Sequence, residues 1–189
     1  PLAATNRPTF SFFRVDVLGW SDFGSFGSPF YDTPHIDQLA AEGVRFTDAY
    51  AACHVCSPTR ASILTVKYPA TLNLTDWLNG RSDRPYQVLQ NPDKVMVLDP
   101  DETTLAEVLK GEGYATALFG KWHLGRGTTP TAHGFDLHVP YSVNSNLGRL
   151  GFYNPKDIPC LDGGEYVTDR LAELAAHYID VNKDNPFLL

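Results

Sequence analysis

Short apolar runs alternate along the chain with stretches whose apolar residues recur at helical spacing. Three runs dense in aromatic and β-branched residues predict β-strands over residues 10–18, 44–50 and 114–119. A fourth apolar run begins at Phe187, directly after the turn residues Asp184-Asn185-Pro186, and predicts the start of another strand. Residues 70–100 are interrupted by glycine and proline, which predicts a long irregular connection.

Apolar residues at helical spacing behind capping residues predict four helices. Thr33-Pro34 and Ser57-Pro58 each place an N-cap residue before a proline, which suits the first helical position. The expected helices cover residues 34–42, 58–64, 102–110 and 167–181. Because helices alternate with strands, the chain is predicted to have an α/β fold with a mostly parallel sheet flanked by helices.

The two ends of the chain bear on its domain organisation. Residues 1–7 are small and polar, and they are interpreted as a leader or a processed N-terminal stub. Residues 8–189 are interpreted as one domain. Since its last apolar run stops as soon as it begins, this domain is expected to be incomplete at the C-terminus, as the N-terminal part of something longer.

Composition narrows the functional classes. The 189 residues include 15 Lys and Arg against 22 Asp and Glu, a formal charge of −7. This balance argues against nucleic acid as a partner, because neutralising phosphates needs a basic face, and it is compatible with a cation site. No run approaches the 18 apolar residues that would predict a membrane span. Three cysteines are too few for a disulfide scaffold.

Two segments early in the chain carry candidate chemistry. Asp16 lies at an apolar strand end, where a carboxylate must be paired, hydrogen-bonded or metal-bound, and an Asp that accepts turn N–H bonds is the ordinary alternative. Cys56 lies just before the helix that Ser57 is expected to cap. The N–H groups and dipole of that helix favour an anion near Cys56, which Arg60 can clamp one turn later.

A third segment follows the strand over 114–119 and lies between Gly120 and Gly125. Lys121 and His123 are two residues apart, so an extended backbone would direct both to one side, as a fixed cation and a titratable acid or base. Trp122 is expected to point the other way, into packing. The pair therefore joins Cys56 and Arg60 as a candidate for hydrolysis of an anionic ester.

The Cys53-x-x-Cys56 spacing leaves two other interpretations open. Such a pair can be a redox couple or half of a zinc site. A redox pair requires a reversible disulfide, and a structural zinc site would need a second cysteine pair that this sequence lacks. Cys160 lies in a predicted loop and receives no role.

These segments together resemble the sulfatase family of formylglycine-dependent hydrolases, in the alkaline phosphatase superfamily. Cys56-Ser57-Pro58-Thr59-Arg60 is similar to the family's Cys-x-Pro-x-Arg signature, and Gly120-Lys121-Trp122-His123-Leu124-Gly125 resembles its second signature. Similar context surrounds both, including Thr33-Pro34-His35-Ile36-Asp37 and His133-Gly134-Phe135-Asp136. The resemblance extends from about Pro8 to Leu189 in the family's order, and it implies the α/β fold of that superfamily.

The resemblance implies a specific chemistry. A separate maturation enzyme would oxidise Cys56 to formylglycine, whose hydrate attacks the sulfur of a sulfate monoester. Arg60 would orient the hydrate, Lys121 would bind a sulfate oxygen, and His123 would assist proton transfer. Arg60 and Lys121 would thus bind substrate, while Asp16 and the modified Cys56 would hold a calcium ion.

Four residues depart from the family's pattern. Val17 stands where the family has a second aspartate ligand, and valine cannot coordinate calcium. Arg14 interrupts an apolar strand, and we interpret it as a tethered positive charge that partly occupies the cation's place. Val66-Lys67 replaces the usual Gly-Arg. The remaining calcium ligands of the family lie C-terminal to Leu189, so this chain alone is expected to turn over aryl sulfates poorly or not at all.

Two other functions stay open beside hydrolysis of sulfate monoesters. One is a phosphonate or phosphodiester hydrolase of the same superfamily, and the other is a noncatalytic anion-binding relative, which Val17 suggests. The resemblance implies a sulfated small molecule or glycan as substrate, the formylglycine-generating maturation enzyme as partner, and a periplasmic or secreted location.

Overall fold

The computed structural model describes the backbone of residues 7–140, 142–144, 149–151 and 167–189. Side chains are described for residues 7–140 and 168–189. The chain divides into two compact units, one formed by residues 13–51 and the other by residues 1–12 together with 52–189. Each unit is described by itself. Cys160 lies outside the described residues.

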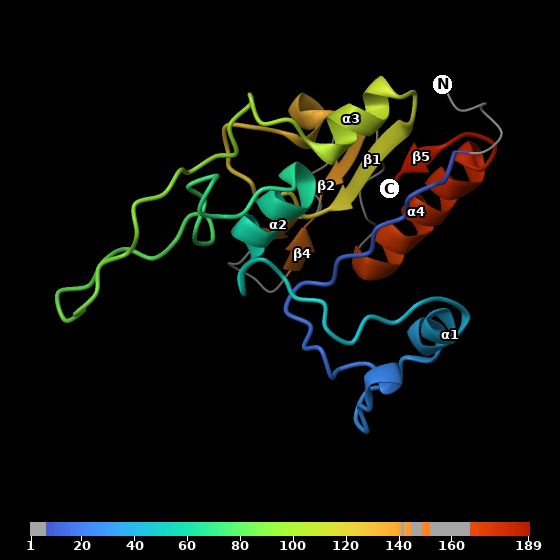
Figure 1. Cartoon of the computed structure of the whole chain (residues 1–189), viewed down its shortest axis with the longest axis horizontal. Helices are drawn as coiled ribbons and strands as arrows, with labels where there is room; N and C mark the ends of the chain where they lie inside the picture. The colour runs from blue at the N-terminus through green and yellow to red at the C-terminus, as the bar shows by residue number, and fades with distance from the viewer. Residues whose placement is uncertain (1–6, 141, 145–148, 152–166) are drawn as a thin grey trace. The chain divides into compact units, whose positions relative to one another are not determined.

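The larger unit contains a parallel three-stranded sheet (Figure 1). Its strands are β1 (Ala115–Gly120), β2 (Leu137–Pro140) and β5 (Phe187–Leu188), in the order β2-β1-β5. The parallel sheet and the strands expected at 114–119 and from Phe187 are confirmed. β2 was not predicted, because Leu137-His138-Val139-Pro140 is short and only Val139 in it is buried.

The strand predicted over residues 10–18 is wrong for most of its length. Phe10 forms a parallel bridge to Leu188, in which it donates to the Phe187 carbonyl at 2.9 Å, and Phe12 donates to the Leu189 carbonyl at 2.7 Å. Among the described residues, no backbone bond to the sheet involves residues 13–18, and residues 16 and 17 form a turn in the smaller unit. An apolar run without a neighbouring strand does not become a strand.

Helices cover both faces of the sheet. α3 (Leu105–Gly111) packs its Ala106 and Leu109 with Leu118 and Leu188, while α4 (Val167–Asn182) packs on the opposite face, where the Tyr178 ring lies 5.8 Å from those of Phe119 and Phe187. Neighbouring strand residues therefore face opposite helices, as strand geometry requires. Both helices were predicted.

α2 (Cys56–Thr65) and several short elements complete the larger unit. A 3-10 helix, η3 (Pro130–His133), precedes β2, and β3 (Ser142–Asn144) pairs antiparallel with β4 (Arg149–Gly151). α2 packs with the connection that leads to α3, through a core cluster of Ala61, Leu72, Leu74, Leu98 and Leu124. Residues 70–100 contain no helix or strand, as predicted.

The smaller unit consists of a 3-10 turn and one helix. η2 (Gly24–Phe26) is tied to α1 (Pro34–Glu42) by Asp37, whose carboxylate accepts the Ser25 N–H at 2.6 Å. The helix was predicted, although none of its residues is buried. The strand predicted over 44–50 is wrong: Val44, Phe46 and Tyr50 are exposed, and the described residues provide no strand beside them.

Candidate active site

Cys56 is the first residue of α2. The N-cap is Val55, in an extended conformation (φ −121°, ψ 165°), so Ser57 lies inside the first turn and does not cap the helix. The prediction that Ser57 is the cap is therefore wrong by two residues. Its hydroxyl instead accepts the backbone N–H of Leu78 at 3.0 Å. Cys56 lies among the N–H groups of the first turn, where the helix dipole favours negative charge.

The second signature segment leaves β1 in a tight turn. Gly120 (φ 102°) and His123 (φ 58°) both adopt left-handed backbone conformations. Because the backbone is not extended, the alternation that would direct Lys121 and His123 to one side does not apply here. A non-glycine residue with positive φ is strained, and such strain clusters at functional sites.

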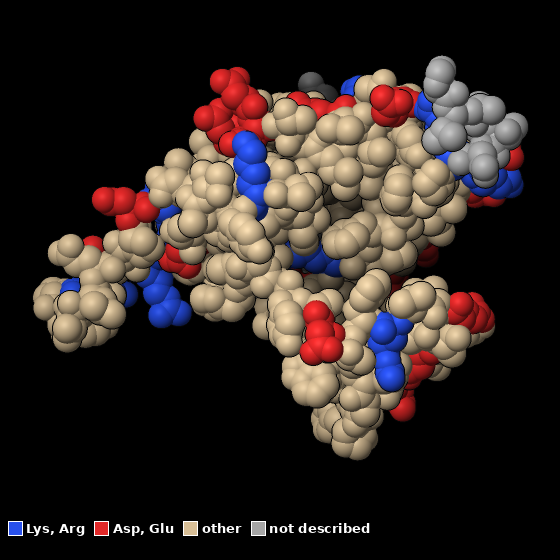
Figure 2. Space-filling model, viewed as in Figure 1, with Lys and Arg blue, Asp and Glu red and all other residues tan. Residues whose placement is uncertain are grey.

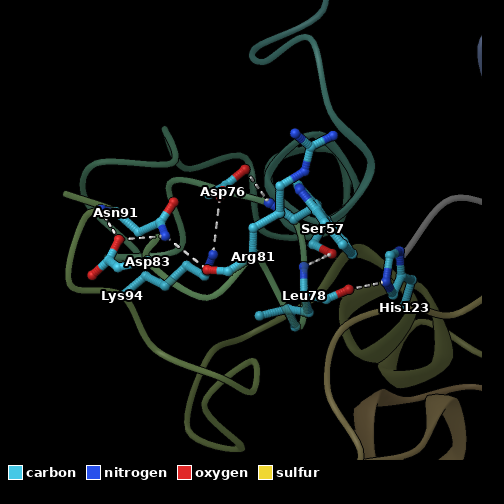
Figure 3. Close-up of polar contacts among 9 residues, drawn as sticks. Ser57, Asp76, Leu78, Arg81, Asp83, Asn91, Lys94 and His123 are labelled. Atoms are coloured by element: carbon cyan, nitrogen blue, oxygen red, sulfur yellow. Dashed lines mark hydrogen bonds and ion pairs between the residues drawn. The ribbon is translucent and has the colours of Figure 1, made fainter. Parts of the chain in front are cut away.

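Arg60 and Leu78 connect this segment to α2. The Arg60 guanidinium donates to the Lys121 carbonyl, and His123 Nε2 lies in hydrogen-bond contact with the Leu78 carbonyl. Leu78 thus bonds to Ser57 through its N–H and to His123 through its carbonyl (Figure 3). Four sequence-predicted site residues, Cys56, Arg60, Lys121 and His123, therefore belong to two segments that are held together by direct contacts.

Trp122 anchors the segment after β1 to the core. Its side chain packs against both core clusters, as predicted, and its ring centroid lies 5.5 Å from that of the fully buried His133. Among the described residues, neither ring nitrogen of His133 has a hydrogen-bond partner. Burial therefore lowers the pKa of His133, because an apolar environment disfavours the charged ring.

The connection between α2 and α3 is closely fitted to the site. Leu98 donates to the Leu124 carbonyl at 2.8 Å, and a side chain at Gly125 (φ 113°) would place its Cβ 2.7 Å from the Val97 Cα. Only glycine allows this approach of two backbones. The buried Lys94 ammonium pairs with Asp76 at 3.1 Å, and this pair stabilises the start of the connection (Figure 3).

Asp16 lies in the smaller unit, at a turn. Its carboxylate pairs with Arg14, with 3.4 Å between Nη2 and Oδ1. Val17 follows and is fully exposed. Its backbone is left-handed (φ 60°), a conformation that aspartate and asparagine tolerate better than a β-branched residue. No group of three His, Cys, Asp or Glu residues suited to a metal occurs in the part of the chain that the structure describes. The metal-ligand roles predicted for Asp16 and Cys56 stay predictions.

Comparison with known proteins settles the family. The Sulfatase family model matches residues 8–189. The chain is also 42% identical over 165 residues to arylsulfatase A of Bos taurus, covering 84% of this chain and 30% of that protein. The chain belongs to the sulfatase family.

Solved sulfatase-like structures agree with this fold. The crystal structure of Ps i-CgsB is 27% identical and superimposes with a TM-score of 0.72, over 92% of this chain and 42% of that one. A second structure, 26% identical with a TM-score of 0.64, contains its substrate D-glucosamine-2-N,6-O-disulfate and is matched over 89% of this chain and 30% of its own. This sulfatase chain thus spans less than half of the relatives it matches.

One feature of the site, the backbone of Leu78, was not predicted from the sequence. The sequence gives Leu78 no polar side chain, yet its backbone links Ser57 to His123. The Asn79-Gly80 turn signal beside it was visible, but a turn signal does not say what the turn contacts.

Among the described residues, no helix of this sulfatase chain is long and apolar enough to cross a membrane.

Proposed function

We propose that this chain carries the nucleophile-bearing part of an enzyme that hydrolyses sulfate monoesters. The observation that supports this most strongly is the pair of contacts from α2 to the segment after β1, Arg60 to the Lys121 carbonyl and Ser57 through Leu78 to His123. These contacts bring the two sulfatase signatures to one place in the larger unit. Neither signature alone would require the other as a neighbour.

Cys56 is proposed to be the residue that a maturation enzyme converts to formylglycine. The thiol is free, half-buried and in the first turn of α2. Formylglycine supplies, as its hydrate, a hydroxyl that can attack the sulfur of the ester. An anionic ester placed there is stabilised by the N–H groups of the first turn and by the helix dipole.

Arg60, Lys121 and His123 are proposed to have separate roles in binding and catalysis. Arg60 orients the nucleophile and supplies fixed positive charge, and its bond to the Lys121 carbonyl fixes the guanidinium. Lys121 binds a sulfate oxygen. His123 assists proton transfer, and its contact with the Leu78 carbonyl orients the ring.

Calcium does not fit the described residues as they stand. Calcium takes six to eight oxygen ligands, whereas Asp16 already pairs with Arg14 and Val17 offers no side-chain oxygen. Arg14, which pairs with Asp16, is proposed to supply a tethered positive charge in partial replacement of the cation.

A second candidate function is a noncatalytic anion-binding relative. The Arg14–Asp16 pair and the strained, exposed Val17 favour it, because together they replace a carboxylate pair with one compensated carboxylate. Such a protein would bind sulfate esters without cleaving them. A sulfated small molecule or glycan is the proposed ligand in both cases, and a periplasmic or secreted location is proposed from the resemblance.

The test is release of inorganic sulfate from an aryl sulfate, by protein produced together with a formylglycine-generating enzyme. We expect slow release that is abolished by Cys56→Ala and kept by the matched control Cys53→Ala. Arg60→Lys should lower the rate by about 100-fold or more, since removing one oriented donor costs that much in comparable sites.

Val17→Asp separates the two candidates. In the presence of calcium this variant should release sulfate faster than the parent if the parent is an impaired enzyme. If neither protein releases sulfate while both bind the ester, the anion-binding function holds. Faster cleavage of an aryl phosphonate than of the aryl sulfate would instead identify a phosphonate hydrolase.

A further inference from the structure

A hollow of about 400 Å³ lies in the connection between α2 and α3, and no proposed catalytic role uses it. Five residues line it: Arg81, Ser82, Arg84, Tyr86 and Gln87. Two of them are arginines and none is a carboxylate. In Figure 2 the part of the molecule that this connection forms, at the left, carries both blue and red groups, so the cationic character is that of the lining residues alone. The charge of the lining therefore favours an anion.

Hydrogen bonds hold the segment around the hollow in a defined form. At its base, Val95 donates to the Asn73 carbonyl at 2.8 Å. Farther out, the Asn91 amide donates to the Arg81 carbonyl at 2.7 Å. At the tip, Gln87 bonds to Arg84 twice, through its own N–H to the Arg84 carbonyl and through its side-chain oxygen to the Arg84 N–H. Contacts at three places along the segment thus hold its outgoing and returning parts together.

The one acidic residue between the two arginines is turned to another partner. Asp83 Oδ1 accepts both the backbone N–H of Asn91, at 2.9 Å, and its side-chain amide, at 2.7 Å. Figure 3 shows the Arg81 side chain extending away from Asp83 and Asn91. Asp83 therefore does not line the hollow, and the arginines keep their positive charge there.

The hollow is connected to the candidate active site through Leu78. This residue bonds to both Ser57 and His123, and Arg81 follows it three residues later. Six residues separate Leu78 from Arg84, so even a fully extended chain limits their Cα separation to about 21 Å. Because this is an upper limit, a glycan of several sugars is the size of ligand that is proposed to reach both places.

We propose that this hollow binds a second anionic group, a sulfate or a carboxylate, on another sugar of the glycan whose sulfate is cleaved. Arg81 and Arg84 bind the oxyanion through charge-assisted hydrogen bonds. Tyr86, whose side chain is largely exposed, offers an aromatic face to the sugar ring, and Ser82 supplies a further polar group. This inference rests on the proposed function for the nature of the ligand, a sulfated glycan.

The test measures binding to a protein that lacks the proposed nucleophile, so the ligand is not cleaved during the measurement. Affinity for a sulfated hexasaccharide and for a monosulfated monosaccharide is measured by calorimetry on the Cys56→Ala protein, with and without Arg81→Gln or Arg84→Gln. Each second substitution should weaken hexasaccharide binding about tenfold, the usual loss for a hydrogen bond to a charged group, and leave the monosaccharide unaffected. Arg170→Gln in α4 makes the same charge change elsewhere and should have no effect on either ligand.

Unchanged hexasaccharide affinity in both arginine variants would overturn the proposal, as would equal losses for the monosaccharide. A uronate hexasaccharide without sulfate that shows the same tenfold loss would identify the bound group as a carboxylate, and no such loss would identify it as a sulfate. An aryl sulfate has no second sugar to place in the hollow, so the release of sulfate from it does not involve the hollow. It therefore reports on the proposed function separately from this site.

Discussion

Val66 is a β-branched residue held in the left-handed backbone region (φ 58°), at the C-cap of α2. This conformation costs about 1–2 kcal/mol for an L-residue with a Cβ, and glycine is the usual residue there. The family pattern has glycine at this position. The side chain is largely exposed, so its removal loses little packing.

Val66→Gly should therefore raise the free energy of unfolding by about 1 kcal/mol, after the greater freedom of glycine in the unfolded chain is subtracted. Urea denaturation measures it. The matched control is Val181→Gly in α4, also exposed but with helical neighbours, which should lower the stability by a similar amount. A loss of stability in Val66→Gly would show that the backbone at residue 66 is not strained.

His133 offers a pH-dependent test at the same scale. Burial lowers its pKa below the ordinary value of 6.5, so the unfolded chain binds more protons than the folded chain below that pH. The contribution of His133 is thus fully present above 6.5 and is lost as pH falls toward the lowered folded pKa. Between about pH 7.5 and about pH 5.5 the loss is at most about 1.4 kcal/mol.

His133→Phe should remove this part of the pH dependence and keep an aromatic ring against Trp122. Urea unfolding at the two pH values gives the comparison. His35→Gln, on the exposed surface of α1, is the control that should leave the pH dependence as it is. An unchanged slope for His133→Phe would mean that another group accounts for the acid sensitivity.

At the scale of elements, the helices followed from their sequence signals, whereas the strands depended on partners. α1 and α4 match the expected ranges within two residues, because helical hydrogen bonds are local. The runs at 10–18 and 44–50 contain good strand-forming residues, yet a strand also needs a neighbour, and a local pattern does not supply one. α2 begins at Cys56 because Ser57 bonds to Leu78, a contact that joins distant parts of the sequence.

Thr104 shows how much one element end can contribute. Its hydroxyl accepts the Glu107 N–H at 3.2 Å, Glu107 returns a bond to the Thr104 N–H at 2.7 Å, and the same hydroxyl donates to the His133 carbonyl at 2.8 Å. Thr104→Ala should lower the free energy of unfolding by about 1–2 kcal/mol, because the cap and a buried bond are lost together.

Chemical denaturation of Thr104→Ala beside Thr103→Ala measures this contribution. Thr103 precedes the cap, is exposed, and should change the stability by less than about 0.5 kcal/mol. If both variants lose the same small amount, the capping box does not stabilise α3. A larger loss for Thr104→Ala would also show that the bond from Thr104 to the His133 carbonyl, which belongs to η3, helps to hold η3 against α3.

At the scale of the whole molecule, the candidate site could be predicted as two segments but not as one place. The signature at Cys56 and the one at Lys121 were both readable in the sequence. What joins them is the Leu78 backbone and the Arg60 bond to a carbonyl, and backbone groups leave no trace in residue identity. Asp16 lies in the other compact unit, so its role as a metal ligand stays a prediction.

Cys56 is proposed to be the position that carries formylglycine, and the function proposed for the chain depends on it. The most direct measurement is to label the protein with an aldehyde-specific hydrazide after co-production with a formylglycine-generating enzyme, and to map the label by peptide mass spectrometry. We predict a labelled peptide that contains residue 56, absent in Cys56→Ala and retained in Cys53→Ala. Recovery of Cys56 only as a free thiol, or as a disulfide with Cys53, would contradict the account.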